Sequence, residues 1–383
     1  MDRVEIEPEQ INVNLEQPSA NQSGLFIIVV VLVLIIIIPV VIIKTKPSTT
    51  IITTTMVTTE IATKETTTIK NTQTTEEQIK SKYKQWKQSG ITIAGGKQRG
   101  DGLNQLNEPH GILIDDSAII IADYDEERIL EWKFNANASE IIAGGNGYGN
   151  KINQLACPID VILDKQNDSL IICDRDNKRV MRSFRKNQTD PQIFIANIWC
   201  YGLAMDNKGS IYVTDSDMHA VRRWKEGDIN GTVVAGGHGK GDQLNQLFYP
   251  SYIFVDKDYS LYISDSSNHR VVKWKNGAKE GIVVAGESKP GNSLMQFSSP
   301  RGVFVDDLGF IYVADYHNHR IMRWCEGDKQ GSIVVDEKDQ EEGSDQLWGP
   351  VDFAFDAEEN LYVSDSGNHR IQKFELCFNK TIC

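Results

Sequence analysis

A nine-residue motif occurs three times in the C-terminal half of this chain, at intervals of fifty residues. Its clearest copies are Ile263-Ser264-Asp265-Ser266-Ser267-Asn268-His269-Arg270-Val271, Val313-Ala314-Asp315-Tyr316-His317-Asn318-His319-Arg320-Ile321 and Val363-Ser364-Asp365-Ser366-Gly367-Asn368-His369-Arg370-Ile371. Weaker copies lie upstream, around Asp123, Asp174 and Asp215. Self-similarity at a period of ~40 to 50 residues is typical of stacked or circular arrays, in which each repeat is one small unit of secondary structure.

One repeat, residues 231–280, indicates how the unit folds. Runs rich in β-branched and aromatic residues occupy 232–235, 252–255, 261–263 and 270–274, and Gly, Asn and Asp lie between them. Such runs favour strands, and the intervening residues favour tight turns. We therefore predict a four-stranded antiparallel meander. A sheet with two apolar faces is unstable alone, so its copies should pack radially as the blades of a β-propeller.

Six runs match the innermost strand of such a blade. They are His110-Gly111-Ile112, Ile159-Asp160-Val161, Tyr201-Gly202-Leu203, Tyr252-Ile253-Phe254, Gly302-Val303-Phe304 and Asp352-Phe353-Ala354. The first outer-strand run, residues 91–94, precedes every inner strand, and the last inner set has no outer strand after it. We predict an all-β fold over residues 90–383, a six-bladed β-propeller of four-stranded antiparallel blades. The N-terminal strand, residues 90–95, should complete the last blade and so close the ring.

Three segments of different composition precede the repeats. Residues 1–24 form a short polar tail, and residues 25–43 are a continuous apolar run. This run is long enough to cross the ~30 Å hydrocarbon core of a bilayer as a helix, and it lacks the basic start of a cleaved signal. Residues 44–89 are rich in threonine and too polar to bury a core. We expect one transmembrane helix followed by a disordered Thr-rich stalk.

Two sets of signals disagree on the side of the membrane where the repeats lie. Lys44 and Lys46 follow the apolar run, and the positive-inside rule alone would place the repeats in the cytosol. In contrast, the Thr-rich segment resembles an O-glycosylated stalk, and the repeats hold all six cysteines and five N-glycosylation sequons. These sequons are at Asn137, Asn167, Asn187, Asn230 and Asn379. We therefore expect a cell-membrane protein with an extracellular propeller and a cytoplasmic N-terminal tail.

The cysteines suggest two disulfides. Cys157 and Cys200 precede the inner strands of neighbouring blades, so we predict that they pair. Cys377 and Cys383 could join the C-terminal tail to the last blade. Cys173 and Cys325 fall at different positions in their blades and have no obvious partner.

The motifs quoted first resemble the NHL repeat, a family of six-bladed propellers. The likeness spans about residues 90–377 and is strongest at Asn268-His269-Arg270, Asn318-His319-Arg320 and Asn368-His369-Arg370. The third blade, with His219-Ala220-Val221, has no arginine at this place. The resemblance implies that the repeated Asp and Arg are structural. It also implies that interaction with other molecules is the usual role of such a propeller.

The net charge and the glycine-rich segments argue against several classes of function. The formal net charge is −13, and the nine acids and nine bases before Gly90 cancel, so the excess belongs to the repeats. An acidic domain is a poor candidate for binding nucleic acid, which depends on clustered Lys and Arg. The glycine-rich segments, such as residues 236–241, lead into further strands rather than a helix, so they are turns and not phosphate loops. No spacing predicts a metal site, a cofactor or a catalytic group.

The residues that differ between blades are the best candidates for a binding site. At the start of each inner strand, where a propeller channel opens, these candidates for ligand binding are His110, Asp160, Tyr201, Tyr252, Arg301 and Asp352. Blades six, one and two adjoin in a closed ring, so Asp352, His110 and Asp160 could converge. Such a cluster could hold a metal or act as acid and base. The alternative is a polar, solvated rim.

Three functions remain open from the sequence. The first is a single-pass membrane protein whose propeller binds a protein or a small extracellular ligand. The second is an enzyme resembling the lyase domain that completes peptide amidation. That lyase holds zinc with three histidines, and only His110 stands at a channel position in this chain. The third is a cytosolic docking platform for ubiquitin machinery or RNA.

Overall fold

The computed structural model describes residues 84–96, 98–185, 190–336 and 346–377. The expected tail, the apolar run 25–43 and most of the Thr-rich segment lie outside these residues. Within the described part of the chain, no helix has both the length and the apolar character to span a bilayer. Asn187, Asn379 and Cys383 also lie outside it.

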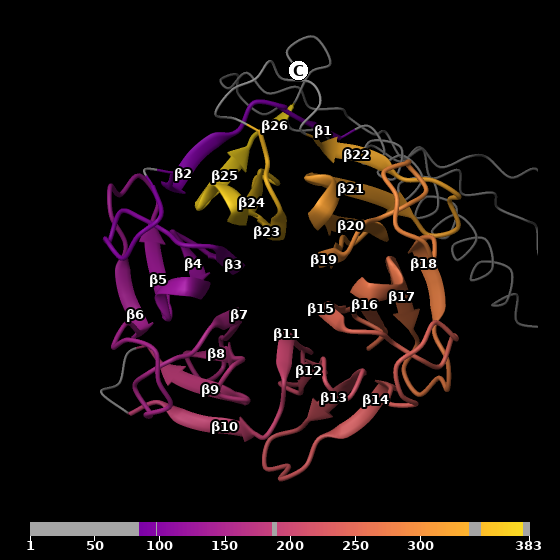
Figure 1. Cartoon of the computed structure of the whole chain (residues 1–383), viewed down its shortest axis with the longest axis horizontal. Coiled ribbons are helices and arrows are strands. Elements are labelled where there is room, and N and C mark those ends of the chain that lie inside the picture. The colour runs from indigo at the N-terminus through magenta and orange to yellow at the C-terminus, as the bar shows by residue number, and fades with distance from the viewer. Residues whose placement is uncertain (1–83, 97, 186–189, 337–345, 378–383) are drawn as a thin grey trace, which may run out of the picture. The chain divides into compact units, whose positions relative to one another are not determined.

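Six four-stranded antiparallel sheets are arranged in a ring, as predicted (Figure 1). The first three blades comprise β3 (Pro109–Asp115), β4 (Ala118–Asp123), β5 (Arg128–Lys133) and β6 (Glu140–Gly144); β7 (Pro158–Asp164), β8 (Ser169–Asp174), β9 (Arg179–Phe184) and β10 (Gln192–Ala196); and β11 (Cys200–Met205), β12 (Ile211–Asp215), β13 (Ala220–Trp224) and β14 (Thr232–Gly236). The fourth and fifth comprise β15 (Pro250–Val255), β16 (Leu261–Asp265), β17 (Arg270–Trp274) and β18 (Ile282–Gly286); and β19 (Pro300–Val305), β20 (Phe310–Asp315), β21 (Arg320–Cys325) and β22 (Ser332–Val335).

The sixth blade is completed by the N-terminal strand, which confirms the predicted closure. It contains β23 (Pro350–Phe355), β24 (Leu361–Asp365) and β25 (Arg370–Phe374) from the C-terminal end, and β2 (Ile91–Gly95) is its outermost strand. β2 pairs antiparallel with β25, with Ile91 opposite Lys373 and Gly95 opposite Arg370. Figure 1 shows this strand from the start of the folded chain beside the last strands of the ring.

The alternating strand directions give the ring two different faces. Each inner strand starts, and each second strand ends, at one face, which also carries the long loops between blades. We call it the loop face. Four short 3-10 turns lie there: η1 (Tyr124–Glu126), η2 (Ser266–Asn268), η3 (Tyr316–Asn318) and η4 (Ser366–Asn368). The opposite face, the turn face, carries the short connections from first to second and from third to fourth strands.

The chain reaches the ring at the turn face, through a strand that the sequence assigned to the stalk. β1 (Gln85–Trp86) pairs with β26 (Leu376–Cys377). The Trp86 indole is 2% exposed, and its N–H donates to the Glu359 carbonyl at 2.9 Å. Its ring lies 5.9 Å from that of Phe355 and 6.1 Å from that of Tyr312. Residues 84–86 therefore fix the end of the Thr-rich segment to blades 5 and 6.

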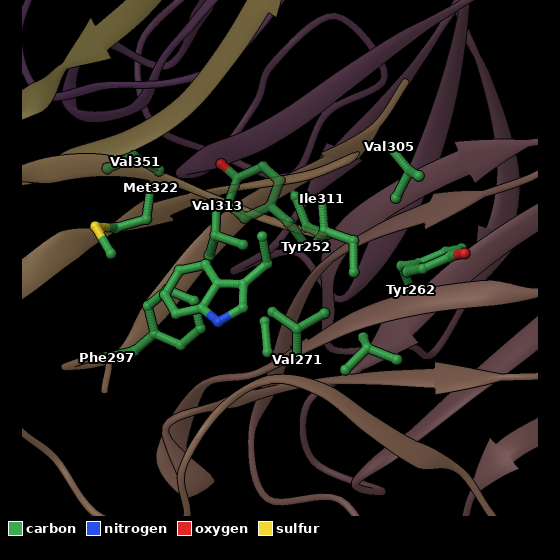
Figure 2. Close-up of a cluster of buried hydrophobic side chains, with 13 residues drawn as sticks. Tyr252, Tyr262, Val271, Phe297, Val305, Ile311, Val313, Met322 and Val351 are labelled. Atoms are coloured by element: carbon green, nitrogen blue, oxygen red, sulfur yellow. The ribbon is translucent and has the colours of Figure 1, made fainter. Parts of the chain in front are cut away.

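Apolar side chains from facing sheets fill the space between blades. Between blades 4 and 5, Val271, Val313, Met322 and Trp324 are buried (Figure 2). The Trp324 ring lies 4.5 Å from that of Phe297, which comes from the loop between these blades. Each sheet therefore buries its faces only against its neighbours, as expected for radially packed repeats.

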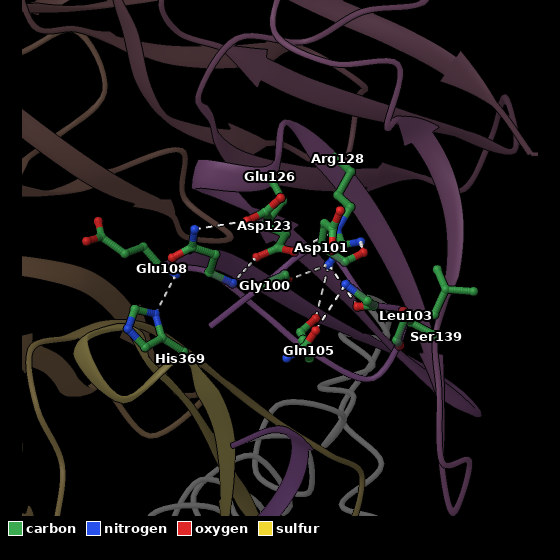
Figure 3. Close-up of polar contacts among 12 residues, drawn as sticks. Gly100, Asp101, Leu103, Gln105, Glu108, Asp123, Glu126, Arg128, Ser139 and His369 are labelled. Carbon is green, nitrogen blue, oxygen red and sulfur yellow. Dashed lines mark hydrogen bonds and ion pairs between the residues drawn. The ribbon is translucent and has the colours of Figure 1, made fainter. Parts of the chain in front are cut away.

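The repeated Asp and Arg are structural, as the sequence indicated. In blade 4 the Asp265 carboxylate accepts from Arg270 Nε at 2.8 Å and from the Phe248 N–H at 2.7 Å, and both charged side chains are buried. In blade 1, Arg128 Nε donates to Asp123 at 2.8 Å, and its other nitrogens donate to carbonyls of the preceding loop (Figure 3). Blade 3 lacks the arginine and instead uses Arg222, which lies 3.4 Å from Asp215.

In blades 3 to 6 the histidine of the motif joins the blade to the next one. His219, His269, His319 and His369 accept at Nδ1 from the backbone N–H of Tyr249, Ser299, Gly349 and Glu108, at 3.4, 3.1, 3.0 and 3.1 Å. The last of these bonds crosses from blade 6 to blade 1 (Figure 3). The histidines have a left-handed backbone. Each accepts a hydrogen bond from a backbone N–H of the next blade that would otherwise be unpaired.

The predicted disulfide between Cys157 and Cys200 is wrong. Cys200, the first residue of β11, pairs with Cys173 of β8, and their Cα atoms are 5.8 Å apart. Cys157, directly before β7, has a left-handed backbone, and its thiol contacts Tyr124. Blades 2 and 3 are therefore joined through the second strand of blade 2. Cys377 is also disulfide-bonded.

Candidate functional site

The six candidate residues form two layers in the channel rather than one ring. Asp160, Tyr252 and Asp352 are the third residues of β7, β15 and β23, in the even blades. His110, Tyr201 and Arg301 are the second residues of β3, β11 and β19, in the odd blades. We call the first set the lower layer and the second the upper layer, because the inner strands start at the loop face.

Glycines in the odd blades make room for the lower layer. A Cβ on Gly111 would lie 2.5 Å from an Asp160 oxygen, and one on Gly302 would lie 2.7 Å from an Asp352 oxygen. These distances are shorter than any contact that a side chain tolerates, so each carboxyl fits only because its neighbouring blade has glycine at the same place. Large and small residues thus alternate around the channel.

The two lower-layer carboxyls make equivalent bonds to the next blade. Asp160 accepts from the Leu203 N–H at 2.7 Å, and Asp352 accepts from the Ile112 N–H at 3.1 Å. Burial raises the pKa of Asp160 well above its usual value, and the nearby Asp352 charge raises it further. Burial also raises the pKa of Asp352, to about 7. The pair therefore retains a proton near neutral pH, because two close carboxylates do not both ionise.

Replacing Asp352 with Asn should make the stability of the propeller less dependent on pH. A carboxyl with a pKa of about 7 when folded and 3.8 when unfolded stabilises the fold fully below pH 3.8 and loses that contribution as the pH rises to 7. For one proton, the free energy of unfolding falls by up to about 1.4 kcal/mol per pH unit in this window. Melting temperatures at pH 5 and pH 7 measure the effect. The melting temperature of Asp352→Asn relative to the wild type should be higher at pH 7 than at pH 5. The same difference in melting temperature at both pH values would contradict the shared proton.

Tyr252 completes the lower layer. Its side chain is buried, and its hydroxyl donates to the Ile159 carbonyl of blade 2 at 3.1 Å. Burial raises the pKa of Tyr252, and the charges of Asp352 and Asp160 raise it further. Its ring meets that of Tyr201 edge-on at 5.7 Å. Tyr252 therefore connects the lower layer to the upper one.

The upper layer carries positive charge. Arg301 lies over the Tyr316 ring, 3.5 Å from its centroid. His110 is buried and stacks on Tyr124 at 4.4 Å. Burial lowers the pKa of His110, and the charges of Arg301 and Arg175 lower it further, so the imidazole is neutral. The His110 charge interactions are thus with arginines and not with the two carboxyls.

A cavity of about 430 Å³ opens at the loop face and includes two of the six candidates, Tyr201 and Arg301. Loop residues that the sequence analysis did not select line the rest of it, among them Arg175, Trp199, Tyr249 and His317. We call this cavity the loop-face pocket. Arg175 and His317 follow the motif aspartates of blades 2 and 5 by one and two residues, a position at the same face as the inner-strand starts. Their position just after the motif aspartate could therefore have identified Arg175 and His317 as residues of the loop face.

A larger cavity, of about 690 Å³, lies on the turn face between blades 1 and 2. Its arginine, Arg185, is already paired with Asp115 at 2.6 Å and with Glu131 at 3.2 Å. Arg185 therefore already has two carboxylate partners, unlike Arg301 in the loop-face pocket.

Metal binding has no support in the described ranges. Nowhere in them do three or more His, Cys, Asp or Glu side chains gather as ligands. The Asp352 charge raises the pKa of Asp160, whereas the charges that act on His110 are those of Arg301 and Arg175.

Comparisons with known proteins agree with this architecture. The NHL repeat matches residues 297–323 and 347–374, in the last two blades and the loops before them, so the chain carries NHL repeats. None of the curated proteins compared with the chain matches it.

Several solved structures share the fold. An auxiliary nutrient binding protein from Bacteroides thetaiotaomicron is 14% identical over 76% of this chain and 77% of its own, with a TM-score of 0.58. A putative phosphatase from the same species is 12% identical over 77% and 80%, with a TM-score of 0.61. A gluconolactonase from Xanthomonas campestris is 15% identical over 76% and 95%, with a TM-score of 0.53. These proteins differ in activity, so function must be argued from the site.

Proposed function

We propose that this chain, a six-bladed propeller with NHL repeats, is a single-pass membrane protein that binds a ligand in the loop-face pocket. The observation that carries the proposal is the position of this pocket. It opens at the loop face over blades 2 to 5, beside the starts of their inner strands, and contains the non-repeating residues Tyr201 and Arg301. Non-repeating residues at a shared opening are not required by the scaffold.

The point where the chain enters the ring supports this orientation. Trp86 fixes the Thr-rich segment to the turn face. With the apolar run 25–43 as membrane anchor, the turn face receives the stalk and the loop face is directed away from that attachment.

The sequons support an extracellular propeller. In the described ranges they are Asn137, Asn167 and Asn230, and all three are exposed. They lie between β5 and β6, between β7 and β8, and between β13 and β14, which are connections of the turn face. Glycans at these sites would leave the loop face uncovered, an arrangement suited to binding there.

The test is a thermal-shift screen of the full chain, in detergent, against a collection of small metabolites. Asp217 is exposed and lines the loop-face pocket, so Asp217→Trp should block the pocket without disturbing the core. Asp307→Trp places the same ring on the turn face and is the matched control. At least one compound should raise the melting temperature of the wild type and of Asp307→Trp, but not of Asp217→Trp. Compounds that stabilise both variants equally would contradict a ligand site in this pocket.

A further inference from the structure

We propose that the loop-face pocket selects a small organic oxyanion, a carboxylate or phosphate carried on a flat ring. This inference rests on the proposed function and names the chemistry of its ligand. It derives from the unused hydrogen-bond donors of two arginines, the charge balance of the pocket and the aromatic side chains around them.

Arg301 is the first anion-binding group. Its side chain is partly buried and lies on the Tyr316 ring. Its guanidinium makes no hydrogen bond or ion pair with any other described residue, although it carries five N–H donors. A partly buried charge without a partner is costly, and the planar guanidinium matches the two oxygens of a carboxylate or phosphate. An oxyanion in the pocket would supply the missing acceptors.

Arg175, which directly follows β8 in blade 2, is the second anion-binding group. It donates only long bonds, at 3.4 Å, to the Tyr124 hydroxyl and to Asp176, and its buried Nε has no partner. Its guanidinium lies 5.6 Å from the centroid of Trp199. Arg175 and Arg301 both line the loop-face pocket, and both charges lower the pKa of the His110 side chain.

The pocket lining carries two arginines in an otherwise acidic domain. The chain has a formal net charge of −13, yet the charged lining residues are Arg175, Arg301 and a single acid, the exposed Asp217. Arg175 pairs with Asp176 at 3.4 Å, whereas Arg301 forms no ion pair with a described carboxylate. The Arg301 charge therefore attracts anions and repels cations at this opening.

The remaining wall suits a flat ring. Trp199, Tyr201 and Tyr249 line the pocket, and aromatic side chains favour offset or edge-on contact with another ring. A volume of about 430 Å³ is within the range of small-ligand sites, about 300 to 1,000 Å³. The ligand is thus a small molecule with one charged end and one flat end.

Calorimetric titration of the full chain, in a neutral detergent, tests the proposal with three probes. Phenyl phosphate and benzoate carry the two oxyanions, and benzyl alcohol is the uncharged counterpart. At least one anion should bind, and benzyl alcohol should bind at least tenfold more weakly. The stronger of the two anions identifies the charged group.

Two variants and a control assign the selectivity. Arg301→Gln should weaken binding of the preferred anion by at least tenfold, and Arg175→Gln should weaken it in the same direction. Lys257→Gln removes the same charge from an exposed site on the turn face and should leave binding unchanged. An unchanged melting temperature shows that each variant is folded.

Three results would overturn the inference: benzyl alcohol binding as tightly as the anions, undiminished binding by folded Arg301→Gln and Arg175→Gln, or no binding by either anion. If benzyl alcohol binds as tightly as the anions and Asp217→Trp abolishes that binding, the anion preference is overturned while the pocket remains a ligand site. Failure of the metabolite screen would instead overturn the site itself.

Discussion

Deleting Gly90–Gly95 should remove most of the stability of the propeller. This deletion takes away β2, including the buried Ala94, so β25 becomes an open edge of the sixth blade and the buried side chain of Ile371 loses its cover. The ring would also open between blades 6 and 1, exposing apolar surface on both. We expect the melting temperature to fall by at least about 10 °C, since each lost kcal/mol shifts it by about 2 to 4 °C in a domain of about 150 to 250 residues.

Two controls separate loss of the strand from shortening of the chain. Deleting Thr66–Lys70 removes five residues of the Thr-rich segment and should leave the melting temperature unchanged. A synthetic peptide of residues 84–96 should restore part of the stability of the Gly90–Gly95 deletion, because it supplies β1 and β2 in trans. An unaltered melting temperature after deletion of Gly90–Gly95 would show that the ring does not depend on this strand.

The blade count and the closure could be predicted because they follow from pattern alone. Each repeat shows four apolar runs separated by turn residues, and only one outer-strand run, residues 91–94, lacks inner strands before it. A ring leaves one position for that strand. The scaffold role of Asp265 and Arg270 could also be predicted, because a pair that recurs in most blades stabilises the fold that all blades share.

The sequence interpretation treated the six channel candidates as one ring, although their offset is visible along the chain. Counted from the start of its inner strand, Tyr201 is the second residue and Tyr252 is the third. The irregular pairing at the start of these strands is what the sequence does not reveal. In blade 4 the register with the second strand shifts between Pro250 and Ile253, and in blade 2 it shifts between Pro158 and Asp160. A shift of one residue turns the side chains that follow it to the other side of a strand.

The disulfide and the pocket were missed because both depend on distances between different blades. Cys157 and Cys200 precede inner strands in the same way along the chain, yet Cys200 lies beside the second strand of blade 2, where Cys173 is. Arg175 and Trp199 come from loops of unrelated sequence that meet Arg301 only when the ring is formed.

Replacing Arg320 with Met should cost about 3 to 5 kcal/mol of folding free energy, because it breaks a buried ion pair and leaves one charge alone. Arg320 Nε donates to Asp315 at 2.8 Å, its other nitrogens donate to three loop carbonyls at 2.9 to 3.0 Å, and both side chains are buried. Burial raises the pKa of Asp315, and Arg320 opposes that rise. Without Arg320 the carboxyl should hold its proton to higher pH, so the loss of stability should grow as the pH rises.

Blade 3 provides the matched control for this prediction. Its substitute pair, Arg222 and Asp215, is 3.4 Å apart, and the arginine side chain is 23% exposed. Water can solvate that carboxylate when the arginine is removed, so Arg222→Met should cost less than half as much as Arg320→Met. Adding Asp315→Asn to Arg320→Met should recover stability at pH 8, because the neutral amide leaves no unpaired charge in the core. Urea unfolding of the wild type, the two single arginine variants and the double variant measures these free energies. Equal losses in the two arginine variants, or no recovery with Asp315→Asn, would show that the cost lies in lost packing and not in a buried unpaired charge.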